Sequence, residues 1–269
     1  MKAPFYWVDA FAAVPFAGNP AAVVLLPGWP ADPVLQRMAA EHALSETAFV
    51  VHRDHGYELR WFTPTVEVDL CGHATLAAAH VLFRHAGHQG TTVEFRSQSG
   101  TLGVTLAGDL LLLDFPSRPA APCPAPEALV RGLGREPFEV LKARDYLAVF
   151  AGEAEVRALE PDLATLAGLE CTGVIVTAPA ASGRGPLGSG TPVDFVSRVF
   201  APQCGIPEDP VCGSAHCTLV PYWAARLGRR KLAARQVSAR GGELWCEDAG
   251  ARVRIGGRAV TYLKGEVEF

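Results

Sequence analysis

The sequence predicts an α+β protein built from two similar halves, and three observations lead to this prediction. Strand-like and helix-like segments alternate along the whole chain. The order strand, loop, Cys-Gly, helix occurs twice, once around Cys71-Gly72 and once around Cys212-Gly213. A proline-rich stretch separates the two occurrences. The length of 269 residues also suits two domains of ordinary size, each with its own core.

The first half is predicted to contain two helices among seven strands. Asp32-Pro33 resembles an N-cap followed by a proline at N1, and it predicts the first helix. The second helix follows Gly72, where apolar residues recur at helical spacing. Strands are expected at Pro4–Phe11, Ala21–Leu26, Thr47–His52, Tyr57–Phe62, Thr92–Arg96, Leu102–Leu106 and Leu110–Phe115.

The second half repeats this order. A helix is expected near Glu153–Leu166, and another follows Gly213. Strands are expected at Pro137–Lys142, Tyr146–Phe150, Gly173–Thr177 and Val193–Phe200, with short strands at the end of the chain.

The boundary between the halves is predicted in the stretch Pro116–Pro126, which contains five prolines in eleven residues. Proline resists both helix and ladder formation, so this stretch suits an interdomain linker. The predicted domains are residues 1–117 and 118–269, and the last strand is allowed to return to the first domain.

A weak internal repeat supports duplication. Arg60, Phe62 and Pro64 precede Cys71-Gly72 much as Arg198, Phe200 and Pro202 precede Cys212-Gly213, although the second loop is three residues longer. Because the same elements recur in the same order, a duplicated architecture is the simplest interpretation.

Composition excludes several functions. The net charge of −4 and the absence of a Lys/Arg stripe argue against nucleic acid as a partner. The longest apolar stretches have strand length, and no basic segment with an apolar core opens the chain, so we expect no membrane association and a cytoplasmic protein. Seven cysteines without a pairing pattern indicate reduced thiols.

The two Cys-Gly turns suggest binding and proton transfer. Gly72 and Gly213 let the backbone approach a ligand, and the free N–H groups of a first helical turn attract anions, so two such turns facing each other would hold a small carboxylate. A helix N-terminus also lowers the pKa of a cysteine, so Cys71 and Cys212 could act as a two-base pair in racemisation or epimerisation. The alternative is that both are small buried side chains.

Other acid/base candidates lie in the same segments. Glu46, between a helix and an apolar strand, is expected to be partly desolvated and able to act as a general base, unless it is a surface or capping residue. His73 and Asp209 lie beside the two turns and could orient substrate or carry protons. The alternatives are a helix cap for His73 and an ordinary turn for Asp209.

The sequence resembles the PhzF-like family of phenazine-biosynthesis isomerases and their uncharacterised relatives. The matching blocks span nearly the whole chain: Asp9-Ala10-Phe11, Gly18-Asn19-Pro20-Ala21-Ala22-Val23, Ser45-Glu46-Thr47-Ala48-Phe49, Arg60-Trp61-Phe62-Thr63-Pro64, Cys71-Gly72-His73-Ala74-Thr75-Leu76-Ala77, Glu208-Asp209-Pro210-Val211, Gly213-Ser214-Ala215-His216 and Arg240-Gly241-Gly242-Glu243.

The resemblance implies the diaminopimelate-epimerase-like fold, in which two pseudo-symmetric domains each wrap a mixed sheet around a central helix, with the active site in the cleft between them. It also implies a homodimer and no cofactor. In the phenazine enzyme a glutamate that matches Glu46 moves a proton within a cyclic dihydro-amino acid. The supporting histidine and aspartate match His73 and Asp209, and Gly72, Gly213 and Ser214 match carboxylate-binding positions.

One departure leaves two acid/base sets open. Cys212 stands where many members of the family have Thr or Ser, so this chain has both cysteines used by related epimerases and racemases, and it also keeps Glu46. The sequence Cys71-Gly72-His73-Ala74 differs from the Cys-Gly-Asn-Gly of diaminopimelate epimerase, so diaminopimelate is not the predicted substrate.

Two further motifs carry no predicted function. Gly183–Gly188 has the spacing of a dinucleotide-binding loop, but it contains a proline and precedes a strand. The group Cys204, Cys212, His216 and Cys217 fits no common zinc spacing, so no metal is predicted.

The leading hypothesis is therefore an isomerase that moves a carbon-bound proton on a small, amino-acid-like carboxylate. A two-thiol racemase or epimerase is the alternative, and a non-catalytic binding protein of the same fold is third.

Overall fold

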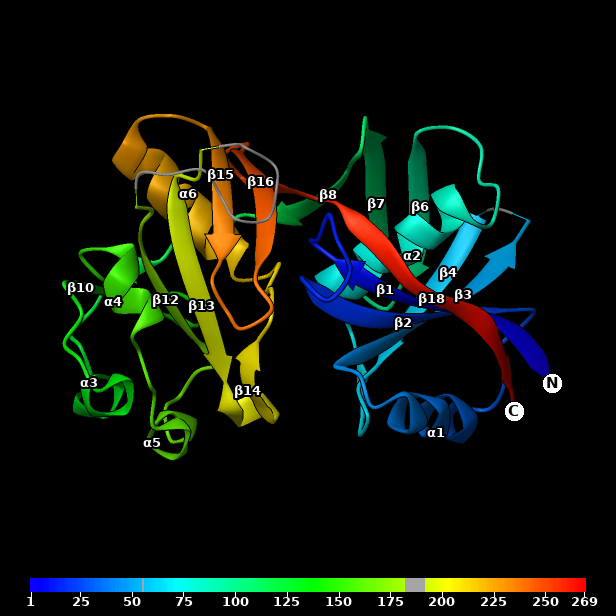
Figure 1. Ribbon diagram of the computed structural model, residues 1–269, viewed down its shortest axis with the longest axis horizontal. Coiled ribbons are helices and arrows are strands. Elements are labelled where there is room, and N and C mark those ends of the chain that lie inside the picture. Colours follow the sequence, from blue (N-terminus) through cyan, green and yellow to red (C-terminus); the bar gives the residue numbers. More distant parts are fainter. Residues whose placement is uncertain (55, 182–191) are drawn as a thin grey trace. The chain divides into compact units, whose positions relative to one another are not determined.

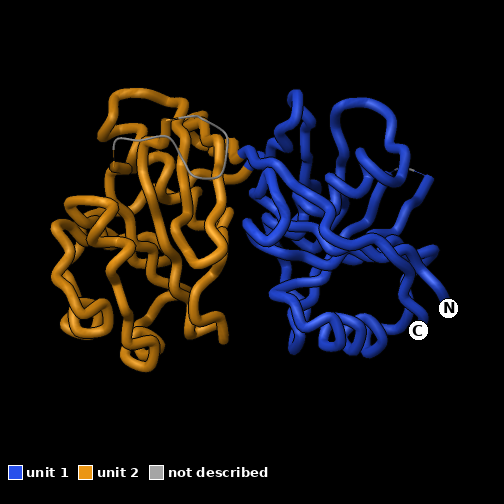
Figure 2. Tube along the Cα trace, in the orientation of Figure 1, with its two compact units in different colours: residues 1–114, 256–269 blue, residues 115–255 orange. Residues whose placement is uncertain are grey.

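The computed structural model describes residues 1–54, 56–181 and 192–269, which form two compact units (Figure 2). Unit 1 comprises residues 1–114 and 256–269, and unit 2 comprises residues 115–255. The first boundary lies three residues before the expected position after residue 117. The last strand belongs to unit 1, because β18 pairs with β1.

The helices of unit 1 are α1 (Asp32–His42) and α2 (Gly72–Arg84). Its strands are β1 (Lys2–Ala10), β2 (Asn19–Leu26), β3 (Glu46–Arg53), β4 (Gly56–Phe62), β5 (Glu67–Val68), β6 (Thr92–Ser97), β7 (Gly100–Ala107), β8 (Leu110–Pro116, its last two residues in unit 2) and β18 (Ala259–Glu268).

The helices of unit 2 are α3 (Glu127–Leu133), α4 (Glu153–Arg157), α5 (Leu163–Ala167), a 3-10 turn (Pro202–Cys204) and α6 (His216–Leu227). Its strands are β9 (Ala121–Pro122), β10 (Glu139–Lys142), β11 (Tyr146–Val149), β12 (Val174–Pro179), β13 (Phe195–Ala201), β14 (Ile206–Asp209), β15 (Lys231–Gln236), β16 (Gly242–Asp248) and β17 (Arg252–Gly257, its last two residues in unit 1).

Helix α2 is the centre of unit 1, surrounded by strands (Figure 1). Residues on all its sides are buried, including the run of alanines 77–79. A helix that is apolar all round is stable only inside a core, and small side chains keep it thin enough for a sheet to wrap around it. Helix α1 packs on the outside, where Leu35 and Met38 join the cluster under β2 and β3.

Helix α6 takes the central place in unit 2, although it contains Pro221. A proline inside a helix cannot donate to the carbonyl four residues earlier. Here that carbonyl, on Cys217, accepts from the backbone N–H of Arg118 at 2.9 Å, so the chain that enters unit 2 satisfies the carbonyl that the proline leaves open.

The two units repeat one pattern of strand pairing. In unit 1, β2 is parallel to β3, β3 is antiparallel to β4, and β4 is parallel to β6. In unit 2, β11 is parallel to β12, β12 is antiparallel to β13, and β13 is parallel to β15. This confirms the predicted α+β class with two pseudo-symmetric halves, each a mixed sheet around a central helix.

The same ion pair holds the loop before each Cys-Gly turn. Arg60 binds both carboxylate oxygens of Glu67, at 2.6 and 2.7 Å, and its guanidinium lies over the ring of Phe62. Arg198 binds both oxygens of Glu208, at 2.8 and 2.9 Å, and lies over Phe200. Each glutamate precedes its Cys-Gly turn by four residues, which gives the repeat a physical basis.

Several local predictions were wrong. Asp32 is the first residue of α1 and not its cap, which is Ala31, and its carboxylate binds Arg60. The expected helix Glu153–Leu166 is two short helices, because Pro161 interrupts the pattern. Helix α3 was not predicted.

The proline-rich stretch is also not a free linker. Ala121 and Pro122 form an edge strand on β10, a position that tolerates proline.

Candidate active site

Glu46 begins β3, three residues after Ala43, the left-handed residue that caps the C-terminus of α1 and turns the chain. Its side chain is only 13% exposed, and its Oε2 lies 3.2 Å from Nε2 of His73, whose side chain is 7% exposed. His73 is the second residue of α2. The parallel pairing of β2 with β3 and the burial of α2 therefore bring the two predicted residues together in unit 1.

The other side of the His73 ring is held by two groups. Its Nδ1 lies 3.3 Å from the amide nitrogen of Asn19 and 3.5 Å from the sulfur of Cys71. Asn19 follows Gly18, which has φ +69°, and a Cβ on that glycine would lie 2.1 Å from the carbonyl oxygen of Ala10. Only glycine fits this tight turn, so Gly18 fixes where Asn19 meets the ring.

Two buried atoms of this group have no hydrogen-bond partner among the described residues. They are Oε2 of Glu46 and Nε2 of His73, which are close enough for an ion pair but are not aligned for a hydrogen bond. The two atoms are each other's ion-pair partner, and such a buried cluster of titratable groups is a candidate functional site.

The protonation of this group differs from the expectation for a reactive thiol. Burial raises the pKa of Cys71, and the charge of Glu46 raises it further, so the predicted lowering by the helix N-terminus is wrong. Burial lowers the pKa of His73, but its contacts with Cys71 and Glu46 outweigh burial, and the pKa lies well above its ordinary value. The group therefore favours a neutral Cys71 thiol.

Donor atoms of Glu46, Cys71 and His73 lie within 4.8 Å of one another, close enough to hold a metal ion. The imidazole, however, directs Nδ1 at the thiol and Nε2 at the carboxylate, so one ion on the ring cannot replace both contacts. The arrangement suits a proton-holding group better than a metal centre.

The predicted residues of unit 2 also lie together. Asp209 ends β14, and its carboxylate accepts from the N–H of Val211, which makes the turn that leads to Cys212. The buried side chain of Gln236 holds this turn at both ends: its Oε1 accepts from the N–H of Cys212 at 3.0 Å, and its Nε2 donates to the carbonyl of Asp209.

Cys212 differs from the predicted thiolate. Helix α6 begins at His216, so the thiol stands four residues before the helix and not at its first turn. Burial raises its pKa well above the ordinary value, and the charge of Asp209 adds to the effect. Both thiols are therefore held in the protonated form, which weighs against the two-thiol hypothesis.

Gly213 is buried, and Ser214 is partly buried in the turn before α6. The hydroxyl of Ser214 lies 3.4 Å from the Cys212 sulfur and accepts from Nη2 of Arg144 at 3.4 Å. Arg144 and Gln236, like Asn19 in unit 1, were not predicted. Of these three residues, only Asn19 had a signal in the sequence, the turn Gly18-Asn19-Pro20.

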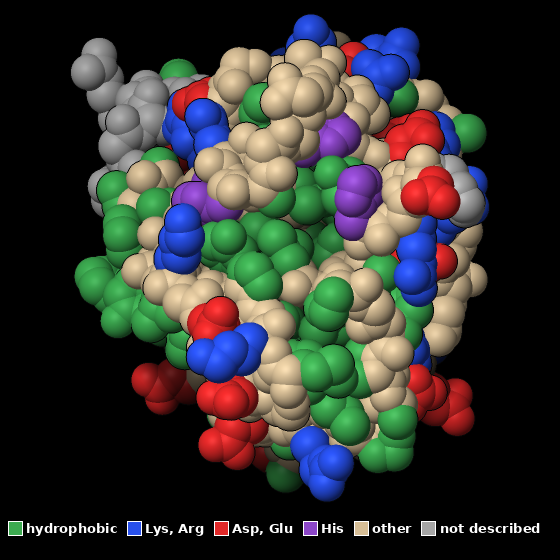
Figure 3. All heavy atoms as spheres, turned by 90° about the vertical axis from the view of Figure 1, so that its right-hand side faces the viewer, with side chains coloured by type: hydrophobic (Ala, Val, Ile, Leu, Met, Phe, Trp, Pro, Cys, Tyr) green, Lys and Arg blue, Asp and Glu red, His purple; other side chains and the backbone are tan. Residues whose placement is uncertain are grey.

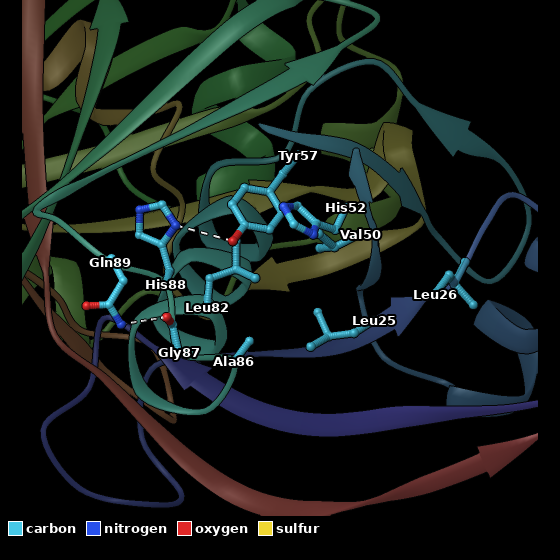
Figure 4. A pocket seen from close by; sticks show the side chains of 10 residues that line it. All are labelled: Leu25, Leu26, Val50, His52, Tyr57, Leu82, Ala86, Gly87, His88 and Gln89. Carbon is cyan, nitrogen blue, oxygen red and sulfur yellow. Dashed lines mark hydrogen bonds between the residues drawn. The ribbon is translucent and has the colours of Figure 1, made fainter. Parts of the chain in front are cut away.

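A separate pocket of about 310 Å³ lies in unit 1, lined by the apolar side chains of β2, β3 and α2 (Figure 4). Its polar groups include His52, stacked on Tyr57, and His88, whose Nδ1 accepts from the Tyr57 hydroxyl. None of the predicted site residues lines it. The face in Figure 3 shows hydrophobic side chains gathered in a hollow, with histidines beside it.

The sequence profile of the phenazine biosynthesis-like proteins, PhzC-PhzF, matches residues 8–265. The chain belongs to this family. Two uncharacterized isomerases of Pseudomonas aeruginosa are each 50% identical to it, over 100% of both chains. The crystal structure of a PhzF-family protein from Enterococcus faecalis is 47% identical, covers 100% of both chains, and has a TM-score of 0.94.

More distant structures share the fold. A predicted epimerase from Pseudomonas aeruginosa is 19% identical, with a TM-score of 0.69 over 99% of both chains. The diaminopimelate-epimerase-like fold predicted for the chain is therefore confirmed, and the chain is an isomerase-like member of its family. The loop Gly183–Gly188 lies outside the described residues. Among the helices formed by residues 1–54, 56–181 and 192–269, none is long and apolar enough to cross a membrane.

Proposed function

We propose that this protein is a cofactor-independent isomerase that moves a carbon-bound proton on a small, amino-acid-like carboxylate, with Glu46 as the acid/base group. The observation that carries the proposal is the ion pair of the largely buried Glu46 carboxylate with His73, whose Nε2 lies 3.2 Å from Oε2 of Glu46. Such a buried pair of titratable groups suits an acid/base role. Membership of an isomerase-containing family supports the same reaction class.

In the proposed reaction the Glu46 carboxylate removes a proton from a substrate carbon, and the electron pair of that C–H bond moves into the adjacent π system. Glu46 then returns the proton to a second carbon, which gives an isomer of the same composition without an oxidant or co-substrate. His73, held by Asn19 and Cys71, positions the carboxylate. We assign substrate-carboxylate binding to Gly72, Gly213 and Ser214, and a supporting role in proton transfer to Asp209.

The test is carbon-bound deuterium uptake in D2O, followed by NMR with a panel of L-amino acids, their cyclic relatives and dihydroaromatic acids. Loss of a well-placed acid/base group typically costs about 10²- to 10⁴-fold in rate, so Glu46→Gln should fall by that factor. Glu41→Gln is the matched control, because Glu41 is an exposed glutamate of α1 and should leave the rate unchanged.

Variants of the two thiols separate the alternatives. Cys71→Ser and Cys212→Ser should keep most of the activity, because both thiols are held neutral. If each cysteine variant abolished exchange while Glu46→Gln remained active, the two-thiol racemase would replace this proposal. No deuterium uptake with any member of the panel would favour the binding protein.

A further inference from the structure

Arg144 lies in the turn between β10 and β11, beside the Ser214 turn of unit 2. Its Nε and Nη2 bind one oxygen of the Asp145 carboxylate at 3.1 and 2.8 Å, and Asp145 is 8% exposed. The same Nη2 reaches the Ser214 hydroxyl, while Nη1 donates to no group among the described residues. The Arg144 side chain is 45% exposed, so its second edge is open to a ligand.

The internal repeat places Arg144 one residue from the position equivalent to Asn19, which contacts His73 in unit 1. In unit 1, Ala22 pairs with Thr47 and Thr47 with Phe62. In unit 2, Tyr146 pairs with Val174 and Val174 with Phe200. Ala22 and Tyr146 are therefore equivalent, since Phe62 and Phe200 are equivalent members of the repeat.

Asn19 stands three residues before Ala22, and Arg144 stands two residues before Tyr146. Asn19 contacts the side chain of His73, and Arg144 contacts the side chain of Ser214. His73 and Ser214 each directly follow a Cys-Gly turn. In each unit, a residue of this turn contacts the residue that follows Cys-Gly. In unit 1 these are the Asn19 amide and the His73 imidazole, and in unit 2 they are the Arg144 cation and the Ser214 hydroxyl.

From this geometry we propose that Arg144, with the Ser214 hydroxyl, is a carboxylate-binding subsite in unit 2 that recognises the negative charge of the substrate. Arg144 is the binding residue, and Asp145 is a positioning residue that holds the guanidinium by one edge. The inference rests on the proposed function, because it names the group that receives the carboxylate of that substrate. Arginine suits this role because its planar fork matches a carboxylate.

The surroundings of the turn are electropositive. Burial raises the pKa of the Cys217 thiol, in the first turn of α6, to about 11, and the charges of Arg118, Arg144 and Arg252 act in the opposite direction. Asp145 balances one of these three cations. In addition, the backbone N–H groups of the short turn before α6 add partial positive charge.

The test is binding of benzoate and its neutral isostere benzamide to the full chain, measured by ligand-observed NMR titration. Arg144→Met should weaken benzoate binding by about tenfold, as expected for a charge-assisted contact at a half-exposed site, and should leave benzamide within about twofold. Arg144→Lys should lie between, because it keeps the charge but not the fork. On an exchanging substrate, Arg144→Met should raise KM more than it lowers kcat.

Arg157→Met is the matched control, because Arg157 has the same 45% exposure and pairs with a partly buried acid of the same unit, Glu153. It should change binding of neither probe. Unchanged benzoate binding by Arg144→Met would overturn the subsite, as would no benzoate binding by the wild type. Equal loss of both probes would also overturn it, since it would indicate a structural role. Deuterium exchange through Glu46 can persist in all of these cases, so failure here is distinct from failure of the proposed function.

Discussion

Gln236 is the residue whose replacement tests most directly how unit 2 holds the turn between Asp209 and Cys212. It is fully buried at the end of β15, and one side chain satisfies the carbonyl of Asp209 and the N–H of Cys212. Gln236→Met keeps the length and approximate volume of the side chain but removes both the donor and the acceptor. The N–H of Cys212 and the carbonyl of Asp209 each lose the hydrogen bond that Gln236 makes with them.

Each lost hydrogen bond in a buried position costs about 1–3 kcal/mol, and both lie in a partly buried turn, so the free energy of unfolding should fall by about 2–4 kcal/mol. Urea denaturation followed by far-ultraviolet circular dichroism measures it. Gln236→Glu should keep the acceptor toward Cys212 but set a carboxylate oxygen against the Asp209 carbonyl. Its destabilisation should therefore shrink as the pH falls and the carboxyl group becomes a donor.

Gln36→Met is the control, because Gln36 is a partly buried glutamine with a single hydrogen bond, to the carbonyl of Thr63. This replacement should lower the free energy of unfolding by about 1 kcal/mol or less. If Gln236→Met lost no more stability than Gln36→Met, the inference that Gln236 clamps the Asp209–Cys212 turn would be refuted.

Three further predictions follow from the structure. Three wholly or partly buried histidines are held in the neutral form, with a pKa of about 4 caused first by burial: His42, His80 and His216. The unfolded chain binds more protons than the folded one between pH about 6.5 and 4, so the free energy of unfolding should fall across that window on acidification, as urea titrations at several pH values would show. Gly18→Ala should lower the free energy of unfolding by about 3 kcal/mol or more in the same urea titration, because its Cβ would clash with the backbone and displace Asn19. The same displacement should slow deuterium uptake by the substrate. Trp223→Phe should lose about 1–2 kcal/mol in thermal unfolding, because the indole N–H donates to the buried Thr177 hydroxyl.

Much of the fold was predictable because it follows local patterns. The strands and the two central helices have regular apolar spacing, and the loops between them carry glycine and proline. The failures occurred where a long-range contact decided the outcome. Asp32 looked like a helix cap in the sequence, but Arg60 takes its carboxylate, and Pro122 sits in a strand because it lies at an edge.

The site was predictable only in part. The Cys-Gly turns are local motifs, and the family resemblance pointed to Glu46 and His73. The groups that contact His73, Ser214 and Cys212 come from distant segments. Asn19 is 54 residues from His73, Arg144 is 70 from Ser214, and Gln236 is 24 from Cys212. The pKa of the thiols was misjudged for the same reason. A helix N-terminus is visible in a sequence, whereas the burial that overrides it depends on the whole fold.

The duplicated framework carries unequal chemistry. The strand register makes Thr47 equivalent to Val174, so the position equivalent to Glu46 is Gly173. Gly173 has no side chain, and a Cβ there would make a tight contact, 3.1 Å from the carbonyl oxygen of Phe200. Unit 2 therefore does not repeat the Glu46 carboxylate.

A mechanism with two matched bases could use only the pair that the repeat does preserve, which is Cys71 and Cys212. Burial raises the pKa of both thiols, and each also faces a carboxylate that opposes a thiolate, Glu46 in unit 1 and Asp209 in unit 2. At neutral pH neither thiol is an effective base. The asymmetry of the repeat thus favours one carboxylate that both removes and returns the proton, which suits movement of a proton between two carbons of a substrate better than inversion at a single carbon.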